Sequence, residues 1–121
     1  MLDFRKLAVW QRSHLLVLSV YHLTRAFPKS ELYALTSQIQ RAAVSIPANI
    51  AEGCGRGGDP DFARFLQISM GSACELEYHI LLAKDLELID EQSYTPLQNE
   101  ITGIKRMLTS LIHRLRTKSE S

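Results

Sequence analysis

Residues 94–115 read YTPLQNEITGIKRMLTSLIHRL, and this stretch decides the fold of the chain. Its large apolar residues recur at intervals of three and four positions, at Tyr94, Leu97, Ile101, Ile104, Leu108, Leu111 and Leu115. This spacing places the side chains along one stripe of an α-helix, as in the seams of left-handed helix bundles. We therefore predict a helix that buries this stripe against other helices.

Three more helices are predicted N-terminal to this one. Turn-forming residues interrupt the chain at 27–30, 53–60 and 90–93, and the segments between them, each roughly 20 to 28 residues long, lack the alternation of a strand. The second helix is expected to begin with Ser30 as its N-cap and Glu31 in its first turn. The third is expected to begin at Asp59, whose side chain caps it, with Pro60 at the first helical position.

The predicted fold is all-α, an up-and-down antiparallel four-helix bundle in which residues 1–121 form a single domain. The second helix has its own apolar row at Leu32, Leu35, Ile39, Ala42, Ile46 and Ile50. Pro47 lies inside it and removes one hydrogen bond, so a kink is expected there. Because small residues let helix backbones approach, we predict contact between the second and third helices at Ala42, Ala43, Ser45, Ala48, Ala51, Ser69, Gly71, Ser72 and Ala73.

The first helix, over residues 7–26, has more apolar surface than one bundle can bury. Leucine and valine side chains share one side, and Trp10, Val17 and Tyr21 share an adjoining one. A helix of this kind covers a second partner, so we predict an oligomer interface there. Its residues are Val9, Trp10, Leu16, Val20 and Leu23. The alternative is that some of these side chains are simply exposed.

Composition excludes several classes of protein. The chain is 45% hydrophobic and 22% charged, as is typical of globular proteins. Its apolar runs are far shorter than the roughly 20 residues that cross a bilayer, and no signal-peptide pattern is seen, so no membrane association is expected. Two cysteines can form at most one bridge, which favours a reduced, cytoplasmic protein. We expect Cys74 in the core and Cys54 as a loop thiol.

No constellation of residues predicts catalysis. A di-iron bundle needs inward glutamates with Glu-x-x-His pairs on two helices. This chain has only Glu75 and His79 one turn apart on one helix, which is more typical of a surface contact. The glycine-rich loop at 53–58 lacks the Gly-Lys-Ser/Thr ending of a P-loop, although its Arg56 is available to an anion. We therefore predict that the protein is not an enzyme and has no metal and no cofactor.

Charge is distributed unevenly although the net charge is only +1. Residues 1–30 have five basic and one acidic side chain, and residues 91–121 have five basic and three acidic ones. Residues 61–90 have two basic and six acidic side chains. This segregation fits contacts between subunits, a basic face for phosphates, or a mixed solvated surface. In the fourth helix Arg106 and His113 fall opposite the seam, with Lys105 and Arg114 beside them, so all should reach solvent. The candidate nucleic-acid-binding residues are Arg41, Arg56, Lys105, Arg106, Arg114 and Arg116.

The chain resembles a known bacterial family in three stretches. They are DFRKLAVWQ at 3–11, LTSQIQRAAVSIPANIAEG at 35–53, and Gly71-Ser72 followed by Glu-Leu-Glu at 75–77. Together they resemble the four-helix bundle family named for 23S ribosomal RNA intervening sequences, over about residues 3–115. The stretch SIPANIAEG is the most specific part, and it supplies the structural motif of Pro47, Asn49, Glu52 and Gly53.

The resemblance implies a closed homopentamer. The family fold is shared with the accessory variability proteins of diversity-generating retroelements, which pair a basic barrel with a reverse transcriptase and its RNA. The resemblance thus implies a non-catalytic, ring-forming accessory protein that binds structured RNA or a reverse-transcriptase-type partner. The chain departs from many members after Gly53, where residues 57–60 replace a more basic stretch and leave Arg56 and Arg64 as cations.

Two questions stay open on the sequence alone. The alternative function is a structural or protein-binding homo-oligomeric scaffold, in which the charged residues serve only assembly. Free cations would favour nucleic-acid binding, and cations paired across subunit contacts would favour the scaffold. The family pattern also marks Glu52, Glu75 and Glu77, and we predict that Glu52 or Glu75 pairs with an arginine.

Overall fold

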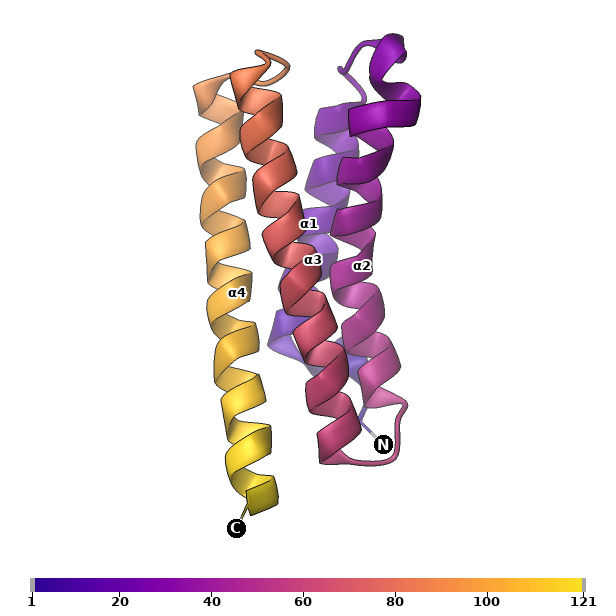
Figure 1. Cartoon of the computed structure of the whole chain (residues 1–121), viewed down its shortest axis with the longest axis vertical. Helices are drawn as coiled ribbons and strands as arrows, with labels where there is room; N and C mark the ends of the chain where they lie inside the picture. The colour runs from indigo at the N-terminus through magenta and orange to yellow at the C-terminus, as the bar shows by residue number, and fades with distance from the viewer. Residues whose placement is uncertain (1, 121) are drawn as a thin grey trace.

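The computed structural model describes residues 2–120, with side chains through residue 118, as four long helices that run alternately up and down (Figure 1). They are α1 (Ala8–Thr24), α2 (Ser37–Cys54), α3 (Asp59–Asp85) and α4 (Glu91–Glu120). Short turns precede the first two: η1 (Phe4–Lys6), η2 (Lys29–Glu31) and η3 (Leu32–Thr36). No strand occurs among the described residues. The predicted all-α, up-and-down four-helix bundle is confirmed.

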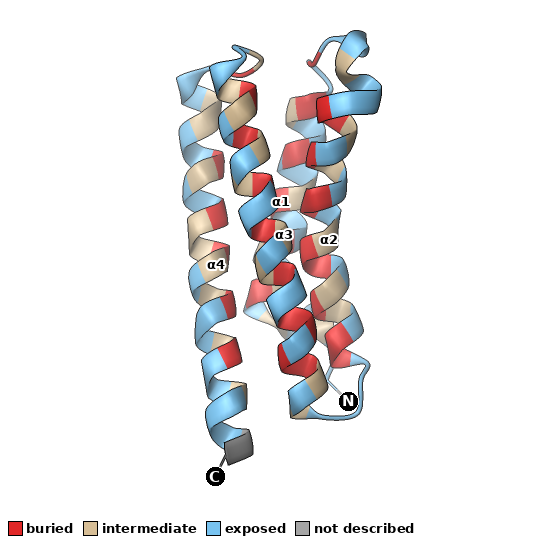
Figure 2. Ribbon diagram, in the orientation of Figure 1, coloured by how far each residue is buried: buried red, intermediate tan, exposed pale blue. Residues whose placement is uncertain are grey.

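The core lies along the inward stripe of every helix (Figure 2). On α4 the predicted seam is buried from Leu97 through Leu108, but beyond it Ile112 is buried while Leu111 and Leu115 are only partly so. A row spaced by three and four has a period of 3.5 residues, whereas the helix has 3.6 per turn, so the row drifts sideways as it lengthens. The seam therefore passes to Ile112 near the end of the bundle.

The start of the second helix differs from the prediction. Ser30 lies inside η2, which has no side-chain cap, and regular α-helix begins only at Ser37. Between them η3 is a single π turn, in which Ala34 leaves the helical region at φ −120° and ψ −105°. A π turn has more residues per turn than an α-helix, so Leu32 and Leu35 no longer share a face. Leu35 is buried and Leu32 is 48% exposed, which corrects the predicted stripe.

The helix caps also need correction. Gly58, in extended conformation, is the N-cap of α3 and makes no side-chain cap bond, so Asp59 is the first helical residue and not the cap. The Asp59 carboxylate still lies at the positive end of the helix dipole, 3.8 Å from Lys118 Nζ. At α4 the Asp90 carboxylate accepts a hydrogen bond of 2.8 Å from the Ser93 N–H, which lowers the pKa of Asp90. An aspartate just before an apolar helix is a recognisable N-cap signal.

Helices α2 and α3 pack together at several of the predicted small residues. Ala48 and Gly71 are exposed instead, and a Cβ added at Gly71 would meet nothing within 4 Å, which corrects the prediction for these two. The Ser69 hydroxyl donates a hydrogen bond of 2.8 Å to the Ile46 carbonyl, and the Ser45 and Ser72 hydroxyls lie 2.7 Å apart. The α2 helix continues through the buried Pro47. Pro47 has no N–H to donate, and two residues later the Asn49 amide donates 2.8 Å to the Ser45 carbonyl. The serine and asparagine side chains thus add hydrogen bonds where the proline weakens the helix ladder.

The two cysteines exchange the places expected for them. Cys54 is buried and Cys74 is exposed, and both are free thiols. Cys54 follows Ile50 by four positions and so extends the buried stripe of α2, whereas the buried stripe of α3 passes through Ala73 and Leu76. Burial raises the pKa of the Cys54 thiol. Among the described helices, none is long and apolar enough to cross a membrane.

Candidate nucleic-acid interface

The C-terminal half of α4 carries three exposed arginines. Arg106, Arg114 and Arg116 are exposed, and none has an ion-pair partner among the side chains of residues 2–118. Arg106 and Arg114 lie eight positions apart, which is about 12 Å along a helix axis, and both border the groove between α1 and α4. We call these three residues the α4 arginines. Their positive charge is available to an external anion.

A groove runs beside the α4 arginines where the start of α1 meets α4. Its volume is about 340 Å³, and Arg106, Ser110 and Arg114 line one side while Leu7 and Val9 contribute from the other. Arg106 also borders a second hollow on the far side of α4, together with His113 and Thr102. Arg106 therefore stands on a ridge between two hollows and can reach a ligand in either.

Lys105 differs from its neighbours and is not available to a ligand. It is half-buried, and its Nζ lies 3.0 Å from Glu77 Oε1 on α3. The Gln98 amide donates a hydrogen bond of 2.7 Å to the other oxygen of the same carboxylate. The hydrogen bonds from Gln98 and Lys105 lower the pKa of Glu77, and the bond to Glu77 raises the pKa of Lys105. The expectation of a solvent-facing Lys105 is thus corrected: this side chain ties α4 to α3.

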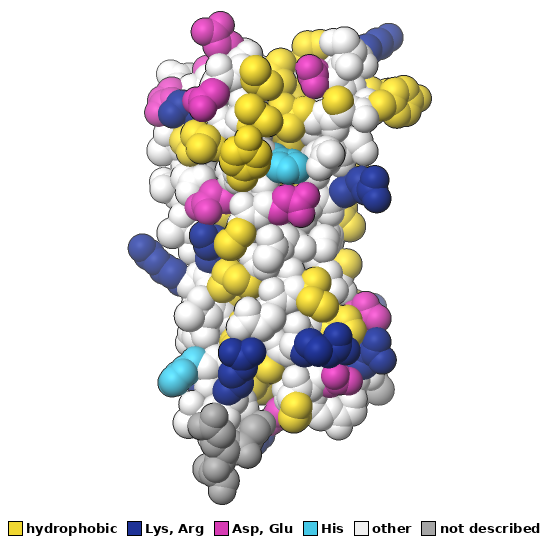
Figure 3. Space-filling model, in the orientation of Figure 1, with side chains coloured by type: hydrophobic (Ala, Val, Ile, Leu, Met, Phe, Trp, Pro, Cys, Tyr) yellow, Lys and Arg dark blue, Asp and Glu magenta, His cyan; other side chains and the backbone are white. Residues whose placement is uncertain are grey.

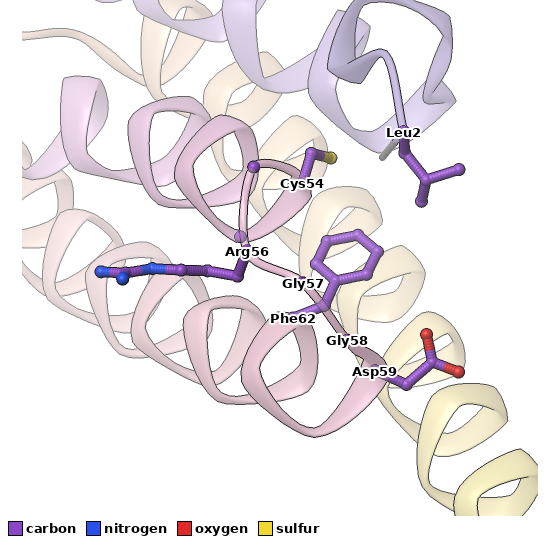
Figure 4. A pocket seen from close by; sticks show the side chains of 9 residues that line it. Leu2, Cys54, Arg56, Gly57, Gly58, Asp59 and Phe62 are labelled. Carbon is purple, nitrogen blue, oxygen red and sulfur yellow. The ribbon is translucent and has the colours of Figure 1, made fainter.

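Arg56, in the glycine-rich loop, is also engaged within the chain. Its Nη2 lies 3.4 Å from Glu52 Oε1, and its guanidinium stacks over the Phe65 ring at 4.8 Å. The predicted pairing of Glu52 with an arginine is therefore confirmed, whereas Glu75 lies 3.7 Å from His79 Nε2. The loop borders a pocket of about 300 Å³, but Arg56 points away from it (Figure 4). No ring of anion-binding groups forms at the loop.

Arg41 occupies a separate place on the molecule. It is exposed on α2, where it lines a cleft that lies between α2 and α3 and includes Glu75. The six predicted nucleic-acid-binding residues therefore do not form one surface. Arg106 and Arg114 border one groove, Arg116 lies further along α4, and Arg41 lies apart on α2, whereas Lys105 and Arg56 are paired within the chain.

The predicted oligomer face on α1 needs a sharper definition. Val9, Leu16 and Val20 are buried in the core of the same chain, and Trp10 and Leu23 are partly buried against it. These side chains belong to the bundle itself, which corrects the prediction for the first three. The apolar side chains that α1 leaves in solvent are Leu15, Leu18 and Tyr21, exposed by 61%, 54% and 41%. Sequence periodicity placed Tyr21 on a second apolar side of this helix but did not single out Leu15 and Leu18. The helix has two apolar faces, and packing alone decides which one turns inward.

Among the described residues, no group of three or more His, Cys, Asp or Glu side chains could hold a metal ion. His14 stacks on Trp10 with ring centroids 5.0 Å apart, and His113 lies exposed on α4. The exposed arginines of α4 are suited to binding an anion by charge.

Comparison with known proteins gives a consistent result. The sequence model of a family described as 23S rRNA-intervening sequence protein matches residues 5–110. A crystal structure of a protein of unknown function, from the S23 ribosomal protein family of Bacteroides thetaiotaomicron, is similar with a TM-score of 0.78 and 28% sequence identity. That similarity covers 87% of this chain and 98% of the other. No curated protein matches the chain.

Proposed function

The chain belongs to the 23S rRNA-intervening sequence protein family, and from this premise we propose that it is a non-catalytic, ring-forming accessory protein that binds structured RNA. The proposal is carried by the α4 arginines, which have no ion-pair partner among the side chains of residues 2–118. Most other cations of the chain lie beside a carboxylate, at distances between 3.0 and 3.8 Å. Exposed arginines without such partners retain the full charge that phosphate contacts need.

Assembly would multiply these contacts. In a closed homopentamer, which the family resemblance implies, each protomer would present its own Arg106, Arg114 and Arg116. Weak contacts repeated by symmetry sum to strong binding of one long polyanion. The exposed apolar residues of α1, Leu15 and Leu18, support an interface because contact with another protomer would remove their apolar surface from water. A reverse-transcriptase-type protein is the partner that such an RNA-bound ring would serve.

The first experiment measures RNA binding by fluorescence anisotropy with a labelled hairpin at two salt concentrations. For three phosphate contacts, affinity should fall on the order of 20- to 40-fold between 50 and 200 mM salt. Changing Arg106, Arg114 and Arg116 together to Ser should remove most of the binding and of the salt dependence. Light scattering should show an unchanged oligomer, because these side chains pair with nothing in the described chain. A mass of one protomer for the parent protein would contradict ring formation.

A charge-matched control separates this surface from net charge alone. Changing Arg5, Arg56 and Arg64 to Ser removes the same total charge from arginines that already lie beside Asp3, Glu52 and Asp61. Exposed pairs of this kind contribute little to stability, so the control should fold. It should retain nearly all RNA affinity. Equal losses in the two triple variants would show that only the overall charge matters.

The second candidate function is a homo-oligomeric scaffold that binds only protein. The exposed face of α1 favours it, as does the acidic balance of residues 61–90, two basic against six acidic side chains, beside the basic α4. An intact oligomer that binds no RNA even at low salt would favour the scaffold over the accessory protein.

A further inference from the structure

A polar cleft opens between the N-terminal half of α2 and the middle of α3, below the π turn η3. Its volume is about 540 Å³, within the range of small-molecule sites, and its lining includes Tyr33, Ser37, Gln38, Arg41, Ser72 and Glu75. We call it the α2–α3 cleft. In Figure 3 basic and acidic side chains lie near one another over the upper halves of α2 and α3.

Tyr33 stands at the rim of this cleft with its ring in solvent. Its side chain is 94% exposed, more than any other large hydrophobic residue described. Tyr33 lies within η3, and single π turns recur at functional sites. A tyrosine ring that packs against nothing contributes nothing to the core, yet it offers a flat face on which a base can stack.

The charges of the cleft are arranged to receive a ligand with both an anion and hydrogen-bond donors. Arg41 and Glu75 both line the cleft, yet Arg41 has no ion-pair partner among the side chains of residues 2–118. Glu75 has only the contact to His79 Nε2 at 3.7 Å. Because Arg41 and Glu75 do not form an ion pair with each other, the guanidinium can bind an anion and the carboxylate can accept hydrogen bonds from a ligand.

We propose that the α2–α3 cleft binds one unpaired guanine nucleotide of an RNA loop. This inference rests on the proposed RNA-binding function and assigns it a base-reading site. The guanine ring stacks on Tyr33, and its adjacent N1–H and N2–H groups donate to the two oxygens of Glu75. The phosphate contacts Arg41, and Ser37 and Gln38 lie in the same cleft for the sugar hydroxyls. Uracil has no amino group on this edge, so a carboxylate favours guanine.

The test compares two hairpin RNAs with the same stem, one with an all-uridine loop and one with a single guanosine in that loop. The parent protein should bind the guanosine loop more tightly. Tyr33→Ala should weaken that binding by about 5- to 150-fold, the range for loss of one stacked base, while Tyr33→Phe should retain it. Glu75→Gln should remove the preference and leave binding to the uridine loop unchanged. Tyr78→Ala is the control, because Tyr78 is 59% exposed on α3 and outside the cleft.

The outcomes separate this inference from the function it rests on. Equal binding of both hairpins by the parent, or Tyr33→Ala with unchanged affinity, overturns the guanine site while the α4 arginines still account for RNA binding. No binding of either hairpin overturns both proposals. A smaller oligomer for Tyr33→Ala in light scattering would assign Tyr33 to a protein contact and overturn the site as well.

Discussion

Replacing Gly53 with alanine should destabilise the bundle, although alanine is the better helix former. A Cβ added at Gly53 would lie 2.9 Å from Phe62 Cδ1 and 2.9 Å from Phe65 Cβ. Ordinary carbon contacts are about 3.5 to 4.0 Å. The Phe62 ring can turn aside, but Phe65 Cβ is attached directly to the backbone of α3. The new methyl group must therefore push α2 and α3 apart at a point where the two helices pack closely.

The size of the effect follows from two opposing terms. Overpacking a tight site costs about 1 to 3 kcal/mol. Alanine regains at most about 1 kcal/mol of helix propensity, and less at Gly53 because α2 ends at Cys54. The net loss should be about 1 to 2 kcal/mol. Gly71, exposed in the middle of α3, has nothing within 4 Å of an added Cβ, so Gly71→Ala should stabilise by roughly 0.5 to 1 kcal/mol.

Urea unfolding followed by circular dichroism measures both changes. All three proteins are compared at one protomer concentration, because assembly makes apparent stability depend on concentration. With a slope of about 1 to 3 kcal/mol per molar urea, the two variants should have midpoints separated by roughly 1 M on opposite sides of the parent. A Gly53→Ala variant as stable as the parent, or shifted in the same direction as Gly71→Ala, would refute the close approach of α2 and α3.

Three further predictions concern packing, charge and capping. Ala43→Leu should lower the free energy of unfolding by about 1 to 3 kcal/mol because Ala43 is fully buried, whereas Ala48→Leu should have little effect because Ala48 is exposed; similar urea midpoints for the two would contradict this. Hydrogen bonds from Gln98 and Lys105 lower the pKa of Glu77 in the folded protein. Ionised Glu77 therefore stabilises the fold fully above about pH 4.3, the ordinary glutamate pKa, and this stabilisation is lost as the pH falls through the lowered pKa of the folded state. In the Glu77→Gln variant, the free energy of unfolding should therefore fall less steeply as the pH is lowered than in the parent. The same pH dependence in both proteins would count against the stabilising contacts of Glu77 with Gln98 and Lys105. Asp90→Ala should lower the melting temperature because the Ser93 N–H loses its acceptor, and an unchanged melting temperature would show that the Ser93 N–H needs no cap.

Helix boundaries show where reasoning from the sequence works and where it stops. The α4 stripe was predictable because its apolar positions are spaced regularly and α-helical hydrogen bonds are local. The π turn at Leu32–Thr36 was not, since its residues fit an α-helical stripe equally well and only the packing of Leu35 against the core selects the wider turn. Asp90 could have been identified as an N-cap from its position before the helix, but Asp59-Pro60 suggested a cap that the extended Gly58 provides instead.

For the candidate interface, residue types were predictable and their availability was not. The basic balance of residues 91–121 and the position of Arg106 opposite the seam follow from the order of residues along one helix. Whether a cation is free depends on what lies beside it on another helix. Lys105 and Arg106 are neighbours in the chain, yet only Lys105 reaches Glu77. The exposure of Tyr33 could not be predicted from the sequence, because it depends on how η3 packs against the core.

The sequence by itself determined the number of helices, their order and most of the stripe that each one buries, because these depend on periodicities within single segments and on turn residues between them. Tertiary structure alone decided which apolar face of α1 turns outward, which cations are neutralised, and that Arg41, Glu75 and Tyr33 share a cleft. Each of these depends on the rotation and axial register of one helix against another. Rotation and register are set by the joint packing of side chains that are distant in the chain, as where the Ser69 hydroxyl donates a hydrogen bond to the Ile46 carbonyl. No local sequence pattern specifies the rotation or the register.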